Sequence, residues 1–309
     1  MTGEGGGEGE VTSIPLPIIP SPARGGEIFV WCSVASTRKE LAEYGLFPKK
    51  RLGQHFLVDQ NILNKVIRAA QVDKEDVVLE VGPGLGEMTI ALARQAKRVI
   101  AVEIDPKLVE ILKKKVEGYS NVEVVKGDIL KVDFSQFLDQ GGHPIKVVAN
   151  LPYQISTPLL FRFIEAKEVF STLTLMIQKE VAERMVASPG SKAYGPLSVF
   201  VQLFSDLSIR FFIKPSAFFP SPKVESAVVH IVWREKPILD LKDEKWFKKV
   251  VRGCFGYRRK TLINALKHSG LSLPQGVEER IEKIGIDPRS RPETLTVQEL
   301  AYLADTLKM

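Results

Sequence analysis

Short runs of consecutive apolar residues recur along this chain, and stretches in which apolar residues repeat every three or four positions lie between them. A short apolar run is typical of a strand buried on both faces, whereas the longer spacing is typical of an amphipathic helix. Strands are predicted at residues 76–81, 99–102, 122–125, 147–150 and 173–177. Helices are predicted at residues 59–70, 88–94, 105–117, 157–164 and 178–187. This alternation predicts an α/β domain built on a parallel sheet.

The two ends of the chain follow other patterns. Residues 1–26 contain seven Gly and four Pro with little to bury, which is typical of disorder. Residues 208–213 and 226–233 predict an antiparallel pair of strands, the second by its alternation. After Pro237 the pattern is helical, at residues 243–255, 258–268, 276–284 and 293–307. We therefore expect a disordered leader at 1–45, an α/β domain at 46–236 and a small all-α domain at 237–309.

Four successive predicted strands end in residues that suit ligand binding. They end in the glycine loop 82–86, in Glu103, in Asp128 and in Asn150. Glycines in a strand-to-helix turn let a ligand approach the backbone, and Glu103 lies at the interval expected of an acid that binds a ribose diol. Glu103 alone also fits a solvated strand end, and Asp128 alone fits a turn. Because strand ends of a parallel sheet meet at one edge, the four together predict a ligand site there.

The apolar run of the fourth predicted strand stops abruptly at the stretch Asn150-Leu151-Pro152-Tyr153. An Asn side chain offers one acceptor and two donors, and Pro152 restricts the residue before it to extended conformations. The result is a stiff corner that presents an amide, a carbonyl and an aromatic ring. A simple turn at a strand end is the alternative interpretation.

The charge and the cysteine content limit which partners and which redox compartment suit this protein. The net charge is +6 with a pI near 9.1, and residues 236–309 hold 15 Lys and Arg against 10 Asp and Glu. This basic segment suits a polyanionic partner. The only cysteines, Cys32 and Cys254, lack the spacing of a disulfide framework or a metal site, so we expect a reducing compartment and no metal.

Two further segments combine aromatic and basic residues. Residues 214–224 hold the adjacent Phe218 and Phe219 together with Lys223 in a proline-rich connection. Residues 252–260 contain four cations, including Arg258, Arg259 and Lys260, around Phe255 and Tyr257. This composition suits contact with phosphates and stacking on bases. Packing of the phenylalanines under the loop, and an ordinary solvated face for the cations, are the alternatives.

Several of these segments together resemble the KsgA type of ribosomal RNA adenine dimethyltransferase. The resemblance covers residues 48–307 and is carried by residues 53–57 (Gly-Gln-His-Phe-Leu), 80–86, 150–153, 218–224 and 258–262. It implies a Rossmann-like class I methyltransferase domain, with a seven-stranded, mostly parallel sheet and an antiparallel edge strand, followed by helices that bind RNA. The implied cofactor is S-adenosylmethionine.

The resemblance also implies roles for individual residues. The implied cofactor contacts are His55 and Leu57 near the methionine part, Gly82 in the loop, Glu103 on the ribose, Asp128 on the adenine and Asn150 near the reacting end. The implied catalytic group is Asn150, Leu151, Pro152, Tyr153 and Phe218. Lys223, Arg258, Arg259 and Lys260 are expected to bind RNA.

The expected reaction is dimethylation of two adjacent adenosines near the 3′ end of small-subunit (16S) rRNA. If Asn150 Oδ1 and the Leu151 carbonyl accept the two N–H groups of the adenine amine, its lone pair turns toward the methyl donor and no strong base is needed. Tyr153 and Phe218 are expected to stack on the flipped base.

Two other functions compete with this hypothesis. One is the Erm type of enzyme, which acts on large-subunit rRNA, and the basic helix at 258–266 argues against it. The other is a binding protein, an inactive relative that acts as an assembly or transcription factor, against which the intact acids and Asn150 argue. We further expect a cytoplasmic, monomeric protein whose partner is small-subunit rRNA or a partly assembled small subunit.

Overall fold

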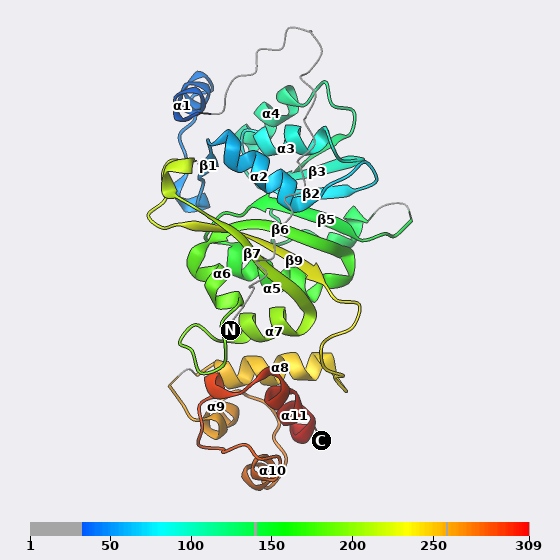
Figure 1. The fold of residues 1–309 in the computed structure, drawn as a ribbon, viewed down its shortest axis with the longest axis vertical. Coiled ribbons are helices and arrows are strands. Elements are labelled where there is room, and N and C mark those ends of the chain that lie inside the picture. The colour runs from blue at the N-terminus through cyan, green and yellow to red at the C-terminus, as the bar shows by residue number, and fades with distance from the viewer. Residues whose placement is uncertain (1–32, 139–140, 258, 309) are drawn as a thin grey trace, which may run out of the picture. The chain divides into compact units, whose positions relative to one another are not determined.

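A seven-stranded sheet lies at the centre of the molecule (Figure 1). The computed structural model describes residues 33–138, 141–257 and 259–308, all within one compact unit. The strands are β1 (Phe56–Leu57), β2 (Val77–Val81), β3 (Arg98–Glu103), β4 (Val122–Lys126), β5 (Ile145–Asn150), β6 (Phe170–Gln178), β7 (Ser205–Ile213), β8 (Phe218–Phe219) and β9 (Ser226–Trp233). The sheet has the order β4-β3-β2-β5-β6-β9-β7.

The predicted fold class is confirmed, with one difference in detail. β4, β3, β2, β5 and β6 pair in parallel, whereas β9 is antiparallel to both of its neighbours. The antiparallel strand therefore lies one position inside the edge, and β7 forms the edge itself. The physical reason is that β9 turns back beside β7 after the short connection at 214–225, so the chain inserts it between β6 and β7.

Helices cover both faces of the sheet (Figure 1). The helices of the described residues are α1 (Val34–Glu43), α2 (Gln60–Ala70), α3 (Glu87–Ala93), α4 (Pro106–Lys115), α5 (Ser156–Glu165), α6 (Lys179–Met185), α7 (Pro196–Phe204), α8 (Glu244–Phe255), α9 (Leu262–His268), α10 (Val277–Lys283) and α11 (Val297–Leu307). Alternate strand residues divide between the two faces, so that Val78 packs with α2 and α3 while Leu79 packs with α5 and α7. Both faces of β2 and nearly all of β3 are buried, as expected for central strands of a parallel sheet.

Helix α1 contradicts part of the predicted disordered leader. Residues 1–32 lie outside the described residues, but residues 34–43 are helical. The helix begins with a reciprocal capping box between Ser33 and Ser36. Leu41 and Leu46 are buried against Leu85 and other apolar side chains at one end of the sheet. The prediction was wrong here because tertiary burial, which this segment's weak local pattern does not reveal, stabilises the helix.

Two other elements were not predicted. Helix α7 is apolar almost all round, with seven of its nine residues buried, so it lacks the amphipathic pattern on which the prediction relied. β1 and β8 form a separate two-stranded ribbon in which Phe56 pairs with Phe219 and Leu57 with Phe218. Strands of two residues carry no periodicity, so only the tertiary structure reveals this ribbon.

The C-terminal helices share a hydrophobic core with the sheet. Phe247 on α8 is 1 % exposed, and its ring lies 6.2 Å from that of Phe200 on α7. Buried residues of α8, α9 and α11 belong to the same apolar cluster as those of β5 and β6. The boundary at residue 236 stays a prediction, since the core continues across it.

Helix α9 begins later than predicted. It starts at Leu262, with Thr261 as its N-cap, rather than at Arg258. Arg259 and Lys260 consequently lie in the turn between α8 and α9, and Arg258 lies outside the described residues. The Lys260 N–H donates to the Tyr257 carbonyl, so the local backbone bond closes a turn and does not continue a helix.

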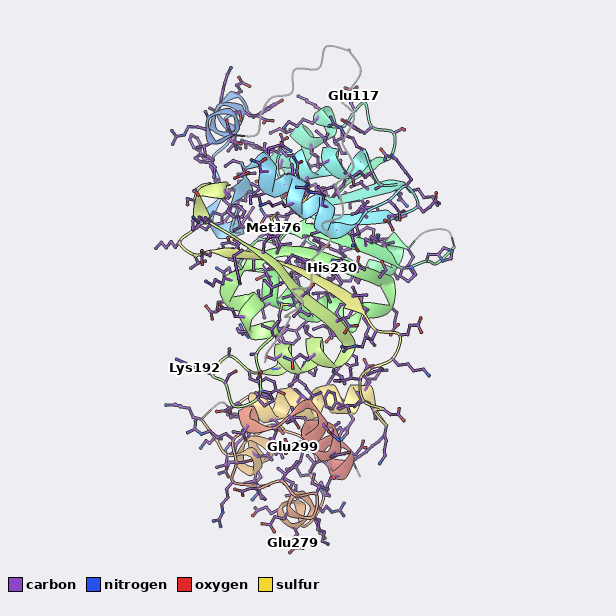
Figure 2. All side chains as sticks on the ribbon, in the orientation of Figure 1. Glu117, Met176, Lys192, His230, Glu279 and Glu299 are labelled. Atoms are coloured by element: carbon purple, nitrogen blue, oxygen red, sulfur yellow. The ribbon has the colours of Figure 1, made fainter. Side chains whose placement is uncertain are left out.

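Side chains are buried or exposed according to their place in these layers (Figure 2). Met176 and His230 lie on central strands and are 1 % and 5 % exposed, while Glu117, Lys192 and Glu279 reach into solvent. Within the described part of the chain, every helix is too short or too polar to span a bilayer.

The continuous core predicts how the protein unfolds. Phe247→Ala removes a buried ring between α7 and α8 and should lower the free energy of unfolding by about 3–5 kcal/mol. Urea denaturation, followed by both fluorescence and circular dichroism, should show one transition shifted as a whole. Lys245→Ala, an exposed position on the same helix, is the matched control and should change little. Two separate transitions, with only one of them shifted, would contradict a shared core.

Candidate active site

The carboxyl ends of β2, β3 and β5 border one open pocket. Its wall includes Gly82, Glu103, Asp128, Asn150 and Tyr153. The structure therefore brings these strand ends to one pocket, because the parallel register places residues far apart in sequence at the same edge of the sheet. Their roles as a ligand site stay a prediction.

The glycine loop between β2 and α3 is shaped by positive φ angles. Gly82, Gly84 and Gly86 have φ values of 66°, 60° and 87°. A Cβ atom on Gly84 would lie 3.1 Å from the ring of Phe56, and one on Gly82 would lie 3.7 Å from Pro152. The loop thus passes close to two other walls of the pocket, and its positive φ angles disfavour any residue with a side chain at these positions.

Glu103 is buried at the end of β3 with both oxygens engaged. Oε2 accepts from the Gly84 N–H at 3.3 Å, and Oε1 accepts from the Asp105 N–H at 2.8 Å. Burial raises the pKa of Glu103, although the backbone donors oppose that shift. Asp105 in turn caps α4 and forms an ion pair with Lys49 at 2.5 Å. This arrangement fixes the carboxylate against the glycine loop.

Glu80 is a second buried acid in the pocket wall, and sequence reasoning missed its importance. It is 0 % exposed, and its Oε2 accepts from the Thr89 hydroxyl at 2.6 Å. Its Oε1 is buried without a hydrogen-bond partner. Burial, together with the charge of the neighbouring Glu103, raises the pKa of Glu80 to about 8, although the hydrogen bond from Thr89 opposes the shift. The signal in the sequence was a lone acid within an otherwise apolar strand, which is unusual unless the acid is functional.

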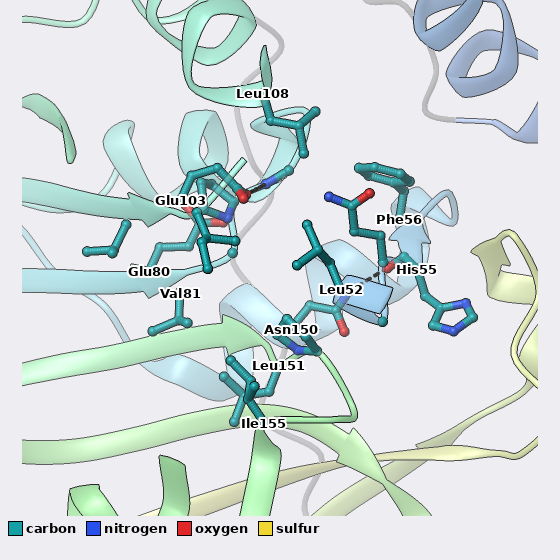
Figure 3. A pocket seen from close by; sticks show the side chains of 18 of the residues that line it. Leu52, His55, Phe56, Glu80, Val81, Glu103, Leu108, Asn150, Leu151 and Ile155 are labelled. Atoms are coloured by element: carbon teal, nitrogen blue, oxygen red, sulfur yellow. Dashed lines mark hydrogen bonds between the residues drawn. The ribbon is translucent and has the colours of Figure 1, made fainter. Parts of the chain in front are cut away.

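The corner at 150–153 is held by specific hydrogen bonds. The Asn150 side chain donates through Nδ2 to the His55 carbonyl at 2.9 Å (Figure 3). The Leu151 N–H donates to the Met176 carbonyl at 3.0 Å, and the Tyr153 hydroxyl bonds with Ser226 Oγ at 2.6 Å. Because Asn150 Nδ2 is committed, Oδ1 is the side-chain atom left to accept from a ligand.

The remaining predicted residues divide between the pocket and its surroundings. Leu57 and His55 line the pocket, as does Asp128, whose Oδ1 accepts from the Leu130 N–H at 3.0 Å. Phe218 does not reach the wall: it is 2 % exposed and packs among the apolar residues around α2.

Three of the basic residues predicted to bind RNA, Lys223, Arg259 and Lys260, lie outside the pocket wall, and the fourth, Arg258, is not among the described residues. Lys223 is exposed in the connection between β8 and β9, and Arg259 and Lys260 are exposed before α9. Among the described residues, no three His, Cys, Asp or Glu side chains gather as metal ligands would.

Comparison with known proteins adds to this geometry. Residues 47–308 match the family described as ribosomal RNA adenine dimethylase. A protein named ribosomal RNA small subunit methyltransferase A from Geobacter metallireducens is 45 % identical, over 84 % of this chain and 95 % of its own. The protein of the same name from Shouchella clausii is 42 % identical, over 88 % of this chain and 94 % of its own.

Solved structures show the same architecture. A dimethyladenosine transferase from Plasmodium falciparum superposes with a TM-score of 0.67 at 32 % identity, covering 81 % of this chain and 96 % of its own. The 23S rRNA methyltransferase ErmE has a TM-score of 0.60 at 26 % identity, covering 82 % and 99 %. The predicted enzyme class and its cofactor, S-adenosylmethionine, are thereby confirmed. The chain belongs to the ribosomal RNA adenine dimethylase family.

Proposed function

We propose that this enzyme dimethylates the N6 amino groups of two adjacent adenosines near the 3′ end of small-subunit rRNA. The observation that carries the proposal is the corner at 150–153, where Asn150 Oδ1 is left as an acceptor in a pocket that also holds two buried acids. The relatives named for the small subunit are 42 % and 45 % identical to this chain, against 26 % for ErmE, which favours the small subunit over the Erm type.

The residues of the pocket fit the cofactor. Gly82 and Gly84 leave room that a Cβ atom would occupy, and Glu103 is fixed where a ribose diol can donate to it. Asp128 can accept from an adenine amine, and Leu57 supplies an apolar wall. Glu80 presents an unpartnered oxygen in a buried wall, which suits the ammonium group of the methionine part. When bound, the cofactor supplies an electrophilic methyl group on a positively charged sulfur.

The corner at 150–153 provides the rest of the chemistry. Asn150 Oδ1 and the Leu151 carbonyl accept the two N–H groups of the target amine, which draws its lone pair out of the adenine ring. Positioning and charge compensation then lower the barrier, and no residue needs to remove a proton before attack. Tyr153 offers a ring in the pocket wall on which the flipped base stacks.

Phe218 can join the stack only after its surroundings rearrange. It is 2 % exposed, and its backbone is held in the β1–β8 ribbon. The predicted sandwich of the base between Tyr153 and Phe218 therefore requires neighbouring side chains to move when RNA binds.

Recognition of the RNA involves surfaces beyond the pocket. Lys223, Arg258, Arg259 and Lys260 contact phosphates of the rRNA or of a partly assembled small subunit. The protein acts as a monomer in the cytoplasm. The intact acids and Asn150 favour an active enzyme over an inactive relative that acts as an assembly or transcription factor.

The first test concerns the acceptor at Asn150. Asn150→Ala should lower the rate of methyl transfer from labelled cofactor to unmodified small subunits by about 100-fold or more, the cost typical of losing one such group in an active site. Asn64→Ala, at an exposed position on α2, is the control and should transfer at the parental rate. Equal rates for the two variants would disprove the mechanism.

The second test concerns the proton on Glu80. A folded-state pKa of about 8 against an ordinary value of 4.5 means that the native protein retains a proton that the unfolded chain has lost. The stability that protonated Glu80 contributes is complete below the pKa of the unfolded chain. It declines as the pH rises from there through the pKa of the folded protein, by up to ~1.4 kcal/mol per pH unit. Glu80→Gln, which keeps an acceptor for Thr89, should remove this decline.

Denaturation at a series of pH values measures this decline in the unfolding free energy. The difference in unfolding free energy between Glu80→Gln and the parent isolates Glu80 from the other acids, including Glu103. The curves should diverge across the interval between the two pKa values. Parallel curves would show that Glu80 is ionised in the free protein.

The third test concerns the turn before α9. Replacing Arg259 and Lys260 together with alanine should weaken RNA binding and reduce the slope of log affinity against log salt by about one to two units, as expected for the loss of one or two phosphate contacts. Cofactor affinity should not change. Lys113 and Lys114, an adjacent exposed pair on α4, provide the matched double variant. If both double variants share one slope, Arg259 and Lys260 belong to an ordinary solvated face.

A further inference from the structure

His55 makes three separate contacts around the corner at 150–153. Its carbonyl accepts from Asn150 Nδ2 at 2.9 Å. Its ring stacks on the ring of Tyr153, with centroids 5.2 Å apart and planes inclined by 29°. Its Nδ1 lies 2.6 Å from the carbonyl oxygen of Pro220. One residue thus connects the end of β5, the start of α5 and the connection after β8.

The contact with Pro220 defines the state of the ring. A carbonyl oxygen only accepts hydrogen bonds, so Nδ1 of His55 must carry the proton. The ring is therefore fixed both in its tautomer and in its rotation. Figure 3 shows the ring directed away from Glu80 and Glu103, while the carbonyl is directed at Asn150.

The β1–β8 ribbon holds His55 in place. Phe56 pairs with Phe219 and Leu57 with Phe218, so His55 and Pro220 are the next residues along the same two strands. The Val58 N–H extends the ribbon by donating to the Ala217 carbonyl at 2.8 Å. The imidazole is consequently tethered to a hydrogen-bonded ribbon, whereas Tyr153 belongs to the corner.

Tyr153 is restrained at two points. Its hydroxyl is bonded to Ser226 at 2.6 Å, and one face of its ring is covered by His55. A ring held only by its hydroxyl could still rotate about that end. The stacked imidazole removes this freedom. Tyr153 is only partly buried and lines the pocket.

We propose that His55 is a positioning residue for methyl transfer, which backs Tyr153 so that the target adenine stacks on the opposite face of that ring. This inference rests on the proposed function. His55 moves no proton and acts through Tyr153. Its ring is not a contact for the methionine part of the cofactor, which is the role that the sequence resemblance implies for this position.

Two other roles for the ring make different predictions. A contact with the cofactor would make cofactor affinity depend on the ring. If the ring instead filled the place of the target base, removal of the ring would accelerate the reaction. The short tether to Pro220 argues against this second role, because the ring would have to break that hydrogen bond to leave.

Single-turnover methyl transfer at saturating S-adenosylmethionine and small-subunit rRNA tests the proposal. His55→Ala should lower the rate by about 10- to 100-fold, the range expected for the loss of one ring contact and one hydrogen bond. Affinity for S-adenosylhomocysteine, measured by calorimetry, should change by less than about twofold because the ring does not bind it. His55→Phe, which keeps a ring without the donor, should recover most of the rate. His55→Asn, which keeps a donor without a ring, should remain close to His55→Ala.

A double-mutant cycle shows whether His55 acts through Tyr153. In a Tyr153→Ala background, His55→Ala and His55→Phe should transfer at the same rate, because no partner ring remains. His268→Ala is the matched control: His268 also approaches a carbonyl through Nδ1, at 2.7 Å from Asn264, and its ring lies 5.5 Å from that of Tyr257, but it is exposed on α9. Its single-turnover rate should equal the parental rate.

Three outcomes would overturn the proposal: a faster His55→Ala variant, a loss of cofactor affinity equal to the loss of rate, or additive effects in the cycle. Nuclear magnetic resonance of the histidine rings provides a measurement independent of activity. It should show the Nδ1-protonated tautomer and a ring-current shift at His55 that Tyr153→Ala abolishes, and absence of either would also overturn it. A parental protein that fails to methylate rRNA would count against the proposed function, while the resonance data would still decide the contact.

Discussion

The hydrogen bond from the Asn150 side chain to the His55 carbonyl is the interaction on which the site depends. It joins the end of the central strand β5 to the β1–β8 ribbon, two parts of the chain that share no sheet. It also fixes which atom of the Asn150 amide faces the pocket. Without it the amide could rotate and present donors in place of an acceptor, and the corner would lose its complementarity to an amine.

A second constraint comes from the two buried acids beneath the glycine loop. Glu80 and Glu103 lie on neighbouring parallel strands, and burial raises the pKa of both. Such a pair is unfavourable in an apolar wall unless a cation or a set of donors compensates it. Glu103 has backbone donors, whereas Glu80 keeps one oxygen without a partner. The wall is therefore suited to a ligand that carries positive charge and hydroxyl donors.

The site depends on elements that lie outside the central sheet. α1 packs with Leu85 in the glycine loop, and Thr37 from this helix reaches the pocket wall. The β1–β8 ribbon supplies Leu57 from its first strand, and His55 directly precedes that strand. The alternating strands and helices therefore provide one part of the pocket wall, and the flanking segments complete it.

The sequence by itself determined the parallel sheet, the positions of its main strands and the meeting of Gly82, Glu103, Asp128 and Asn150, since these follow from local periodicity and from the geometry of parallel strands. Only the tertiary structure decided the conformation of segments whose local pattern is weak or uniform. Burial of Leu41 stabilises α1, and Phe218 lies in the apolar core and not in the pocket wall. The tertiary structure also turned the ring of His55 onto Tyr153. The physical reason is that these outcomes depend on contacts between residues distant in sequence, such as the 165 positions that separate His55 from Pro220, and no local pattern records them.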